Sequence, residues 1–153
     1  MTTPSQRLAE LGLELPPVAA PVAAYVPATI SGGQVLTAGQ LPFVDGKLTD
    51  TGKVGAQVSP ERAAELARTA ALNAVAAAAS VVGGVDGIAR VVRLVVFVAS
   101  DPGFTGQPAV ANGASLLLQE VFGEAGIHVR SAVGVAVLPL DSPVEIELVV
   151  EAA

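Results

Sequence analysis

The sequence predicts an α+β fold in which two helices pack on one face of a mostly antiparallel sheet. Short segments with period-two hydrophobic patterning alternate with two longer segments at helical spacing. Their order is strands, helix, strand, helix and two strands, without an internal repeat or linker. With 153 residues the chain can bury one sizeable core. We therefore expect one domain over residues 1–153, in which 1–24 form an N-terminal extension and a proline-rich arm.

The N-terminal extension combines a short amphipathic segment with an extended arm. Thr2–Gly12 places Arg7, Leu8 and Leu11 at amphipathic spacing, which predicts a helical turn or a short helix. Leu15–Pro27 contains four prolines. Because proline lacks a backbone donor, this arm is expected to have no regular hydrogen bonding.

Two short strands and a loop-rich segment follow. Ala28–Ile30 and Gln34–Ala38 are predicted to pair across a glycine turn at residues 31–33. Gly39–Val58 is rich in Gly, Asp and Thr, and it leaves room for one short strand around Lys47–Thr49.

The clearest helix begins after Ser59, which is a candidate N-cap. Pro60 suits the first helical position and Glu61 the first turn. Helical spacing continues until Gly83-Gly84 ends the run. The alanine-lined face of this helix would let it lie close on a sheet.

In the next strand, Ile88–Ala99, both the odd-numbered and the even-numbered positions carry apolar side chains. This pattern is typical of a strand covered on both faces. One cover would be the first helix and the other a neighbouring subunit. Ser100–Pro108 is predicted to be a loop and Ala111–Gly123 a second helix.

A hairpin is expected to end the chain. Ser131–Leu138 and Val144–Val150 would be its strands, joined by a turn at residues 139–143. The last strand alternates cleanly, so Glu145 and Glu147 share one face.

Composition excludes several classes of function and favours an oligomer. The formal charge is −6 and only two lysines are present, so a basic nucleic-acid-binding face is not expected. Without cysteine and with one histidine, the chain lacks the usual ligands of a cysteine or histidine metal site. Because only 14% of residues are charged and the mean hydropathy is +0.62, we expect subunits to bury surface against each other.

A cytoplasmic location is expected, because no segment suits membrane insertion. The N-terminus carries Arg7, Glu10 and Glu14 where a signal peptide needs an apolar core. The uncharged helical stretch Thr69–Val85 is too short and too weakly apolar to span a bilayer.

Arg130 is the first candidate for chemistry, since it lies in the most apolar third of the chain without a nearby opposite charge. Its guanidinium could hold a substrate carboxylate bidentately, or it could form a structural ion pair with Glu145 or Glu147. Those two carboxylates could perform acid–base chemistry if burial raises a pKa, or they could be a solvated strand face. His128 is either a proton carrier or a loop or interface histidine.

Tyr25 and the glycine clusters are weaker signals. The only tyrosine could bind a ligand or close the core. The glycines match no phosphate-binding loop, and no G-x-S-x-G nucleophile elbow occurs.

Three motifs resemble the reactive intermediate deaminase (Rid, or YjgF-like) family. Thr37-Ala-Gly-Gln-Leu-Pro42 resembles its T-S-G-Q-[IL]-P motif. The run Arg130-Ser-Ala-Val-Gly-Val-Ala-Val-Leu-Pro139, followed by Val144-Glu-Ile-Glu147, resembles its R-S-x-V-x-V-x-x-L-P signature and acidic strand. Tyr25 lies 13 residues before Ala38, as the site tyrosine of the family lies before the motif serine.

The resemblance implies a chorismate-mutase-like fold, a homotrimer and sites in the clefts between subunits. It implies that water adds to a reactive 2-imino acid, releasing ammonia and a 2-oxo acid, without a cofactor. By position, Arg130 would hold the substrate carboxylate and Glu145 would position or activate the water. Tyr25 and the backbone of Gly39 would line the pocket, beside Ala132.

Two departures from the family pattern keep alternatives open. Ala38 replaces the usual serine, and Ala132 replaces a frequent cysteine whose backbone carbonyl is the part used. A non-catalytic homotrimer that binds a small carboxylate metabolite in the same cleft is therefore the second reading. The ribonuclease activity ascribed to some members is the third, and the acidic charge disfavours it. A local lengthening by three residues around Asn112–Ser115 leaves the position of the family's site asparagine open.

The predicted hairpin also indicates a site shared between subunits. If the turn is centred on Asp141, Glu145 pairs near Val137, seven residues from Arg130. At ~3.3 Å per residue this separation exceeds ~20 Å along the strand. The two side chains would then share a pocket only across a subunit boundary.

Overall fold

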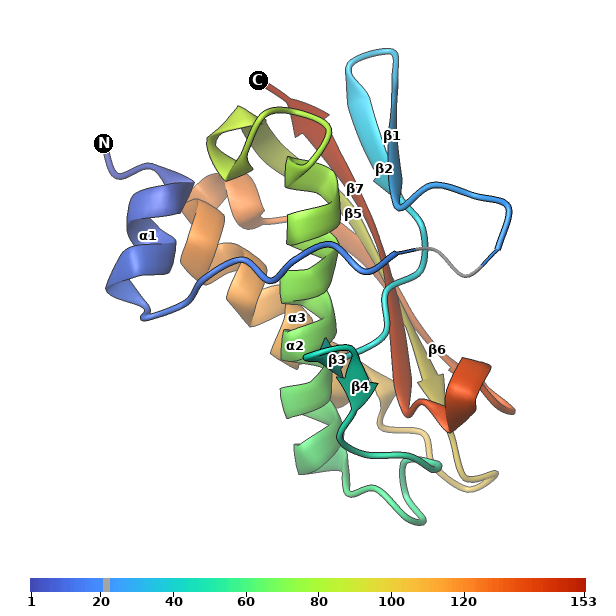
Figure 1. The fold of residues 1–153 in the computed structure, drawn as a ribbon. Helices are drawn as coiled ribbons and strands as arrows, with labels where there is room; N and C mark the ends of the chain where they lie inside the picture. The colour runs from blue at the N-terminus through green and yellow to red at the C-terminus, as the bar shows by residue number, and fades with distance from the viewer. Residues whose placement is uncertain (21–22) are drawn as a thin grey trace.

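A five-stranded sheet, covered on one face by two helices, forms the frame of the molecule (Figure 1). The computed structural model describes residues 1–20 and 23–153. The strand order is β1-β2-β7-β5-β6, and only the β5–β6 pair is parallel. The predicted fold class is thereby confirmed. The elements of this frame are β1 (Ala28–Ser31), β2 (Gln34–Thr37), α2 (Pro60–Ala79), β5 (Ile88–Ala99), α3 (Gln107–Phe122), β6 (Val129–Val135) and β7 (Val144–Ala152).

The N-terminal helix α1 (Pro4–Glu10) confirms the short helix expected there. Thr3 caps it, and its side chain accepts a hydrogen bond from the Gln6 amide. Ser5 donates to Asp86 through both its amide and its hydroxyl, which fixes α1 to the segment before β5. The following arm crosses α2 (Figure 1). The part of the predicted arm at residues 21–22 lies outside the described residues.

Helix α2 begins as its sequence predicts. Ser59 is the N-cap, and its hydroxyl accepts a hydrogen bond from the amide of Arg62 at 3.1 Å. The alanines of its inner face are buried, which brings α3 so close that a Cβ at Gly113 would overlap the carbonyl oxygen of Ala64. The helix ends at Ala79, before the predicted glycine pair.

Tight turns join the short strands. β1 and β2 pair across Gly32 and Gly33, whose φ angles are 59° and 82°, as the sequence predicts. β3 (Phe43–Val44) and β4 (Lys47–Leu48) form a second hairpin, which places a strand where one was expected near Lys47. Its turn is Asp45-Gly46, both with positive φ, and this dipeptide is a hairpin signal that the sequence prediction did not use.

The second helix begins four residues earlier than predicted, because Pro108 belongs to its first turn rather than to the preceding loop. Proline suits that position, where a backbone N–H has no helical partner. Residues Gln107 to Val110 are thereby helical as well, and this change places Pro108 on α3.

The predicted C-terminal hairpin is wrong. β6 and β7 do not pair, because β5 lies between them and bonds to both. β5, α3 and β6 form a β-α-β unit, whose crossover helix makes the two strands parallel. β7 instead lies between β2 and β5, and Glu145 is opposite Phe97 rather than Val137.

The two faces of the sheet differ in burial. Leu94, Val96 and Val98 of β5 are fully buried under the helices. The other face is uncovered within one chain, and Leu36 and Val133 there are 41% and 44% exposed. Among the described residues, no helix is long and apolar enough to cross a membrane.

Candidate functional site

Arg130 lies on the edge strand β6, and its side chain reaches the start of α3. Its Nη1 donates to Oδ1 of Asn112 at 2.7 Å and to Oγ of Ser115 at 3.0 Å, and its Nη2 donates to the carbonyl of Pro108 at 3.2 Å. The three partners are spaced along α3 so that they share one face of the helix. Arg130 forms no ion pair within residues 1–20 and 23–153, so the alternative of a structural ion pair with Glu145 or Glu147 is not found there.

The contacts of Arg130 leave a pair of donors unused. A guanidinium carries five N–H groups, and three of those of Arg130 are bonded to α3. Within the part of the chain that the structure describes, Nε–H and one Nη2–H have no acceptor. Two donors from one guanidinium are what a carboxylate uses when it is bound bidentately. The geometry therefore suits a carboxylate ligand.

His128 belongs to the same cluster. It lies two residues before Arg130, and Oγ of Ser115 lies 2.9 Å from its Nε2. Its Nδ1 lies 2.6 Å from the carbonyl oxygen of Gly126. The histidine is thus tied to α3 and to the short helix η2 (Gly123–Gly126), and through Ser115 it contacts Arg130 indirectly.

Glu145 lies on β7 and on the uncovered face of the sheet. It packs against Gly39, where a Cβ would overlap its carboxyl oxygen Oε1. Burial raises the pKa of the Glu145 carboxyl, and the negative charge of nearby Glu147 adds to the effect. A carboxyl group with a raised pKa accepts and returns protons closer to neutral pH.

The Thr37–Pro42 motif forms the connection that brings Gly39 to Glu145. The hydroxyl of Thr37 accepts a hydrogen bond from the amide of Leu148 at 3.0 Å. Gln40 then pairs with Ile146 through two backbone hydrogen bonds of 2.7 and 2.9 Å. These bonds bracket Gly39 and fix its backbone beside the carboxyl group.

The other predicted pocket residues divide between the two faces. Ala38 is half-buried next to Gly39, and its amide donates to the carbonyl of Pro27. Tyr25 precedes β1 and is 49% exposed. Ala132 lies on β6 opposite Val96, on the helix side of the sheet.

Arg130 and Glu145 are not brought together within one chain. Arg130 is opposite Leu94 on β5, whereas Glu145 and Val133 are both opposite Phe97. The offset is three residues along and two strands across, so the Cα atoms lie on the order of 14 Å apart. Because the offset is odd, the side chains leave opposite faces of the sheet. The separation is shorter than the ~20 Å predicted from the hairpin, because that hairpin does not exist.

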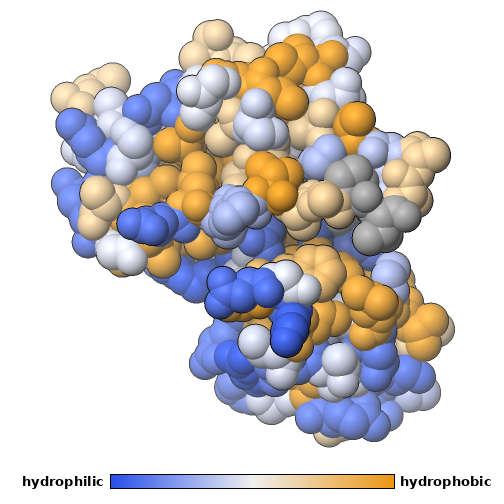
Figure 2. Space-filling view, viewed as in Figure 1, coloured by the Kyte–Doolittle hydropathy of each residue, from blue (hydrophilic) through white to orange (hydrophobic). Residues whose placement is uncertain are grey.

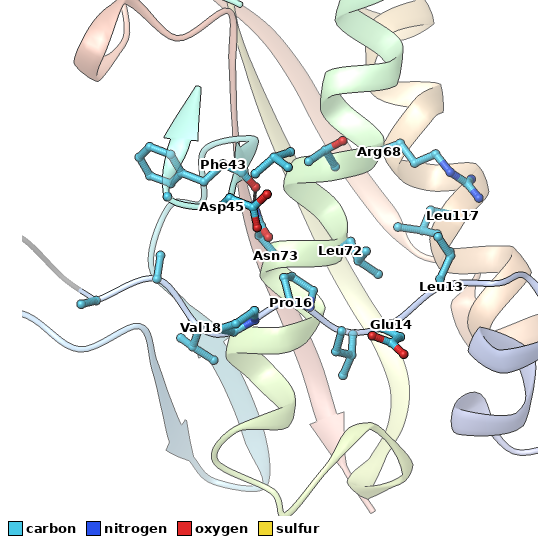
Figure 3. Close-up of a pocket in the computed structure, with 17 residues that line it drawn as sticks. Leu13, Glu14, Pro16, Val18, Phe43, Asp45, Arg68, Leu72, Asn73 and Leu117 are labelled. Atoms are coloured by element: carbon cyan, nitrogen blue, oxygen red, sulfur yellow. Dashed lines mark hydrogen bonds between the residues drawn. The ribbon is translucent and has the colours of Figure 1, made fainter. Parts of the chain in front are cut away.

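A groove elsewhere on the molecule contains none of the predicted site residues. It has a volume of about 830 Å³ and lies between the arm, the β3–β4 turn and α2. Figure 2 shows hydrophobic side chains gathered in patches on the face that the arm crosses. In Figure 3, Pro16 and Val18 of the arm face Leu72 and Asn73 of α2. The Asn73 amide donates to the carbonyls of Leu41 and Phe43, which ties the β3 segment to the helix.

The sequence reasoning missed the roles of Pro108 and Ser115 and left Asn112 open. Asn112 and Ser115 are three residues apart on the predicted helix, and Pro108 joins their face only when the helix is started at Gln107. No three His, Asp or Glu side chains of the described residues come together as metal ligands would.

Comparisons with known proteins agree on one family. The chain matches the family model described as "YjgF/chorismate mutase-like, putative endoribonuclease" over residues 5–152. It is 46% identical over 145 residues to "Protein TCP17" of Trypanosoma cruzi, covering 94% of this chain and 91% of that protein. The fold is similar to that of a putative endoribonuclease from Shewanella oneidensis, with a TM-score of 0.94, 38% identity and coverage of 97% and 99%. It is also similar to Atu1372 of Agrobacterium tumefaciens, a protein of unknown function, with a TM-score of 0.89, 44% identity and coverage of 98% and 92%.

Proposed function

The chain belongs to the YjgF/chorismate mutase-like, putative endoribonuclease family, and on that premise we propose that it hydrolyses reactive 2-imino acids. The products are a 2-oxo acid and ammonia, and the reaction takes place in clefts between subunits. The observation that carries the proposal is the arrangement of Arg130, which offers two unused donors from a guanidinium held by three neutral acceptors.

Arg130 binds the substrate carboxylate. Asn112 and Ser115 occupy both hydrogens of Nη1, and Pro108 occupies one of Nη2, so Nε–H and the second Nη2–H are available to the ligand. A bidentate guanidinium–carboxylate pair fixes both the position and the plane of a planar imino acid. The imine carbon is then presented to water from one side.

Glu145 positions and activates that water. Its raised pKa favours proton exchange at the carboxyl group when water adds to the imine carbon. Water forms the C–O bond while the imine nitrogen gains a proton, which gives a carbinolamine. Loss of ammonia from this carbinolamine breaks the C–N bond and leaves the 2-oxo acid. The backbone of Gly39, with Ala38, Tyr25 and Ala132, lines the pocket.

The site is assembled from two subunits of a homotrimer. Glu145 and Gly39 supply one half from the uncovered sheet face, and the edge strand of a neighbour supplies Arg130. The uncovered sheet face carries exposed apolar side chains, including Leu36, Val129 and Val133. Their exposure supports burial of this face against other subunits of the trimer. Mixing Arg130→Ala with Glu145→Gln subunits should restore activity at the fraction of clefts that receive both intact halves. Complete absence of complementation would contradict a shared site.

The test of the reaction uses 2-aminoacrylate generated enzymatically in the assay, together with a few bulkier imino acids. Ammonia and 2-oxo acid release are measured for the wild type, Arg130→Ala and the control Arg68→Ala. Arg68 is a suitable control because its guanidinium pairs with Glu120 on the helix side of the molecule. Acceleration by wild type and Arg68→Ala, lost in Arg130→Ala, is the expected result. Equal rates with and without protein would refute the proposed reaction.

A second candidate function is binding of a small carboxylate without turnover. Ala38 and Ala132 favour it, because they remove polar side chains from the pocket while Arg130 is retained. Calorimetry would then detect binding of a 2-oxo acid that depends on Arg130, in a protein that does not accelerate ammonia release. RNA cleavage, to which the family description refers, is disfavoured by the charge of −6 and the scarcity of lysine.

A further inference from the structure

A directed chain of hydrogen bonds leads from Arg130 to the backbone at the end of α3. The carbonyl of Gly126 can only accept, so the short contact to Nδ1 of His128 requires the proton on Nδ1. In the neutral ring, Nε2 is then an acceptor, and the Ser115 hydroxyl donates to it. The oxygen of Ser115 remains available to accept from Nη1 of Arg130. Each donor in the chain therefore has one defined acceptor.

The far end of this chain is rigid. Gly126 is buried, and a Cβ at its position would overlap the carbonyl oxygen of Leu118 on α3. Ser115 is 7% exposed and lies on the inner side of the same helix. Close packing on α3 holds the Gly126 backbone, and burial limits the space in which the Ser115 side chain can turn, so both partners of His128 are held in place.

We infer that Ser115 and His128 are positioning residues that fix the guanidinium of Arg130 for its ligand, an inference that rests on the function proposed above. A free arginine side chain has many rotamers, and only one of them binds a carboxylate bidentately at a given position. Restricting the side chain to that rotamer costs entropy, which weakens binding unless the rotamer is already fixed. Ser115 selects the rotamer through Nη1, and His128 orients the Ser115 hydroxyl. The ligand then meets donors that are already in place.

The Ser115 hydroxyl, the His128 ring and the Gly126 carbonyl also have the order of a nucleophile, a base and an orienting carbonyl. Two observations oppose this alternative. Ser115 is almost completely buried, and its oxygen already accepts a hydrogen bond from Arg130. A nucleophilic hydroxyl needs an open path to the substrate, and a side chain that is 7% exposed does not offer one. Positioning is therefore the role that the geometry favours.

The experiment is a double-mutant cycle in the intact protein. Ser115→Ala, Arg130→Ala and the double variant are compared by KM and kcat for 2-aminoacrylate, and by calorimetric titration with 2-oxobutanoate, a stable carboxylate. His128→Phe tests the same inference from the other side of Ser115. It keeps an aromatic ring and removes the hydrogen bonds to Ser115 and Gly126. Ser80→Ala is the matched control, because the Ser80 hydroxyl bonds only to the Ala77 carbonyl of its own helix.

We expect Ser115→Ala and His128→Phe each to weaken 2-oxobutanoate binding and raise KM by on the order of tenfold, with a smaller change in kcat. In the Arg130→Ala background, Ser115→Ala should have no further effect, since it acts through the guanidinium. Additive losses in that background, or losses no larger than those of Ser80→Ala, would overturn the inference and leave the proposed function intact.

Two further outcomes separate the inference from the proposed function. If Arg130→Ala leaves both turnover and 2-oxobutanoate binding unchanged, the proposed function itself is wrong. If a fluorophosphonate probe labels Ser115 in the folded protein, Ser115 is a nucleophile and not a positioning residue.

Discussion

Gly39→Ala tests the assignment of Glu145 more selectively than replacement of the carboxylate itself. A methyl group at residue 39 would overlap Oε1 of Glu145 and would lie only 2.8 Å from its Cδ, where ordinary contact begins at 3.4 Å. The carboxyl group must therefore move by on the order of 1 Å. A displacement of this size at a catalytic group costs about 10²-fold in rate.

The same substitution should leave the fold nearly unchanged. The overlapping atoms are the end of a flexible side chain, and the φ angle of Gly39 is not in the left-handed region, so alanine is tolerated by the backbone. The expected change in the free energy of unfolding is within about 1 kcal/mol. Gly39→Ala should therefore reduce activity without changing stability. A substitution of Glu145 does not separate these two effects, because it changes both.

The assay compares ammonia release with the midpoint of thermal unfolding for wild type, Gly39→Ala and Gly103→Ala. Gly103 is a suitable control, because a Cβ there would make only one ordinary contact, at 3.7 Å with Asp101. A Gly39→Ala protein that retains its midpoint and keeps its rate within about threefold of wild type would refute the placement of Glu145 in the reaction. A rate reduced by about 10²-fold with an unchanged Gly103→Ala rate is the expected result.

Three further predictions concern stability. Gly113→Ala should lower the free energy of unfolding by about 1–3 kcal/mol, because its methyl group would overlap the Ala64 carbonyl between α2 and α3. Asp50→Asn should cost less than about 1 kcal/mol at neutral pH, because the Arg62 hydrogen bonds that lower the pKa of Asp50 are partly solvent-exposed. Glu145→Gln should raise stability at neutral pH, since burial raises the pKa of that carboxyl and makes its charged form unfavourable.

Chemical denaturation at several pH values checks these three variants. The deficit of Asp50→Asn should disappear as pH falls through the lowered pKa of Asp50, where wild type loses its ionised carboxylate. The advantage of Glu145→Gln should shrink as pH falls through the raised pKa of Glu145, where wild type becomes neutral. Differences that do not vary with pH would contradict both assignments. Leu116→Ala, at an exposed position of α3, is the control for Gly113→Ala, and equal losses would contradict close helix packing.

Local signals predicted most of the elements. The ends of β5 agree with the prediction at both Ile88 and Ala99, because turn residues and β-branched patterning act over a few residues. The start of α2 follows from Ser59 and Pro60 for the same reason. The pairing of β1 with β2 across its glycine turn was also predicted, whereas the predicted pairing of the last two strands was wrong.

The failure at the C-terminus has a specific cause. Two strands joined by a short turn most often form a hairpin, so Ser131–Leu138 and Val144–Val150 are predicted to pair. The competing signal was the strand–helix–strand order from β5 through α3 to β6, which is typical of a parallel crossover. That crossover places β6 at the sheet edge and leaves the other side of β5 to β7.

Motif spacing supplied the candidate site residues but not the contacts between them and their neighbours. Arg130 and Glu145 were found from motif spacing, whereas Ser115 and Asn112 meet Arg130 only because α3 packs beside the edge strand. Such contacts depend on which helix face meets the sheet, and the sequence alone did not show that the face with Asn112 and Ser115 lies toward β6. The proximity of Gly39 to Glu145 depends likewise on the pairing of Gln40 with Ile146.

Arg130 and Glu145 leave opposite faces of the sheet, so the proposed activity requires assembly of subunits. A single charge introduced on the uncovered face should therefore abolish both the assembly and the activity. Val133 lies in the same cross-strand row as Glu145 and is 44% exposed in one chain. Val133→Asp would bury an unpaired carboxylate between subunits, which costs several kcal/mol per subunit. Val44→Asp is the matched control, since Val44 is 47% exposed on the β3–β4 hairpin. Sedimentation should show monomers, and ammonia release should be lost, for Val133→Asp alone. A monomeric Val133→Asp protein with wild-type turnover would mean that one chain contains a complete site, which the opposite directions of Arg130 and Glu145 do not allow.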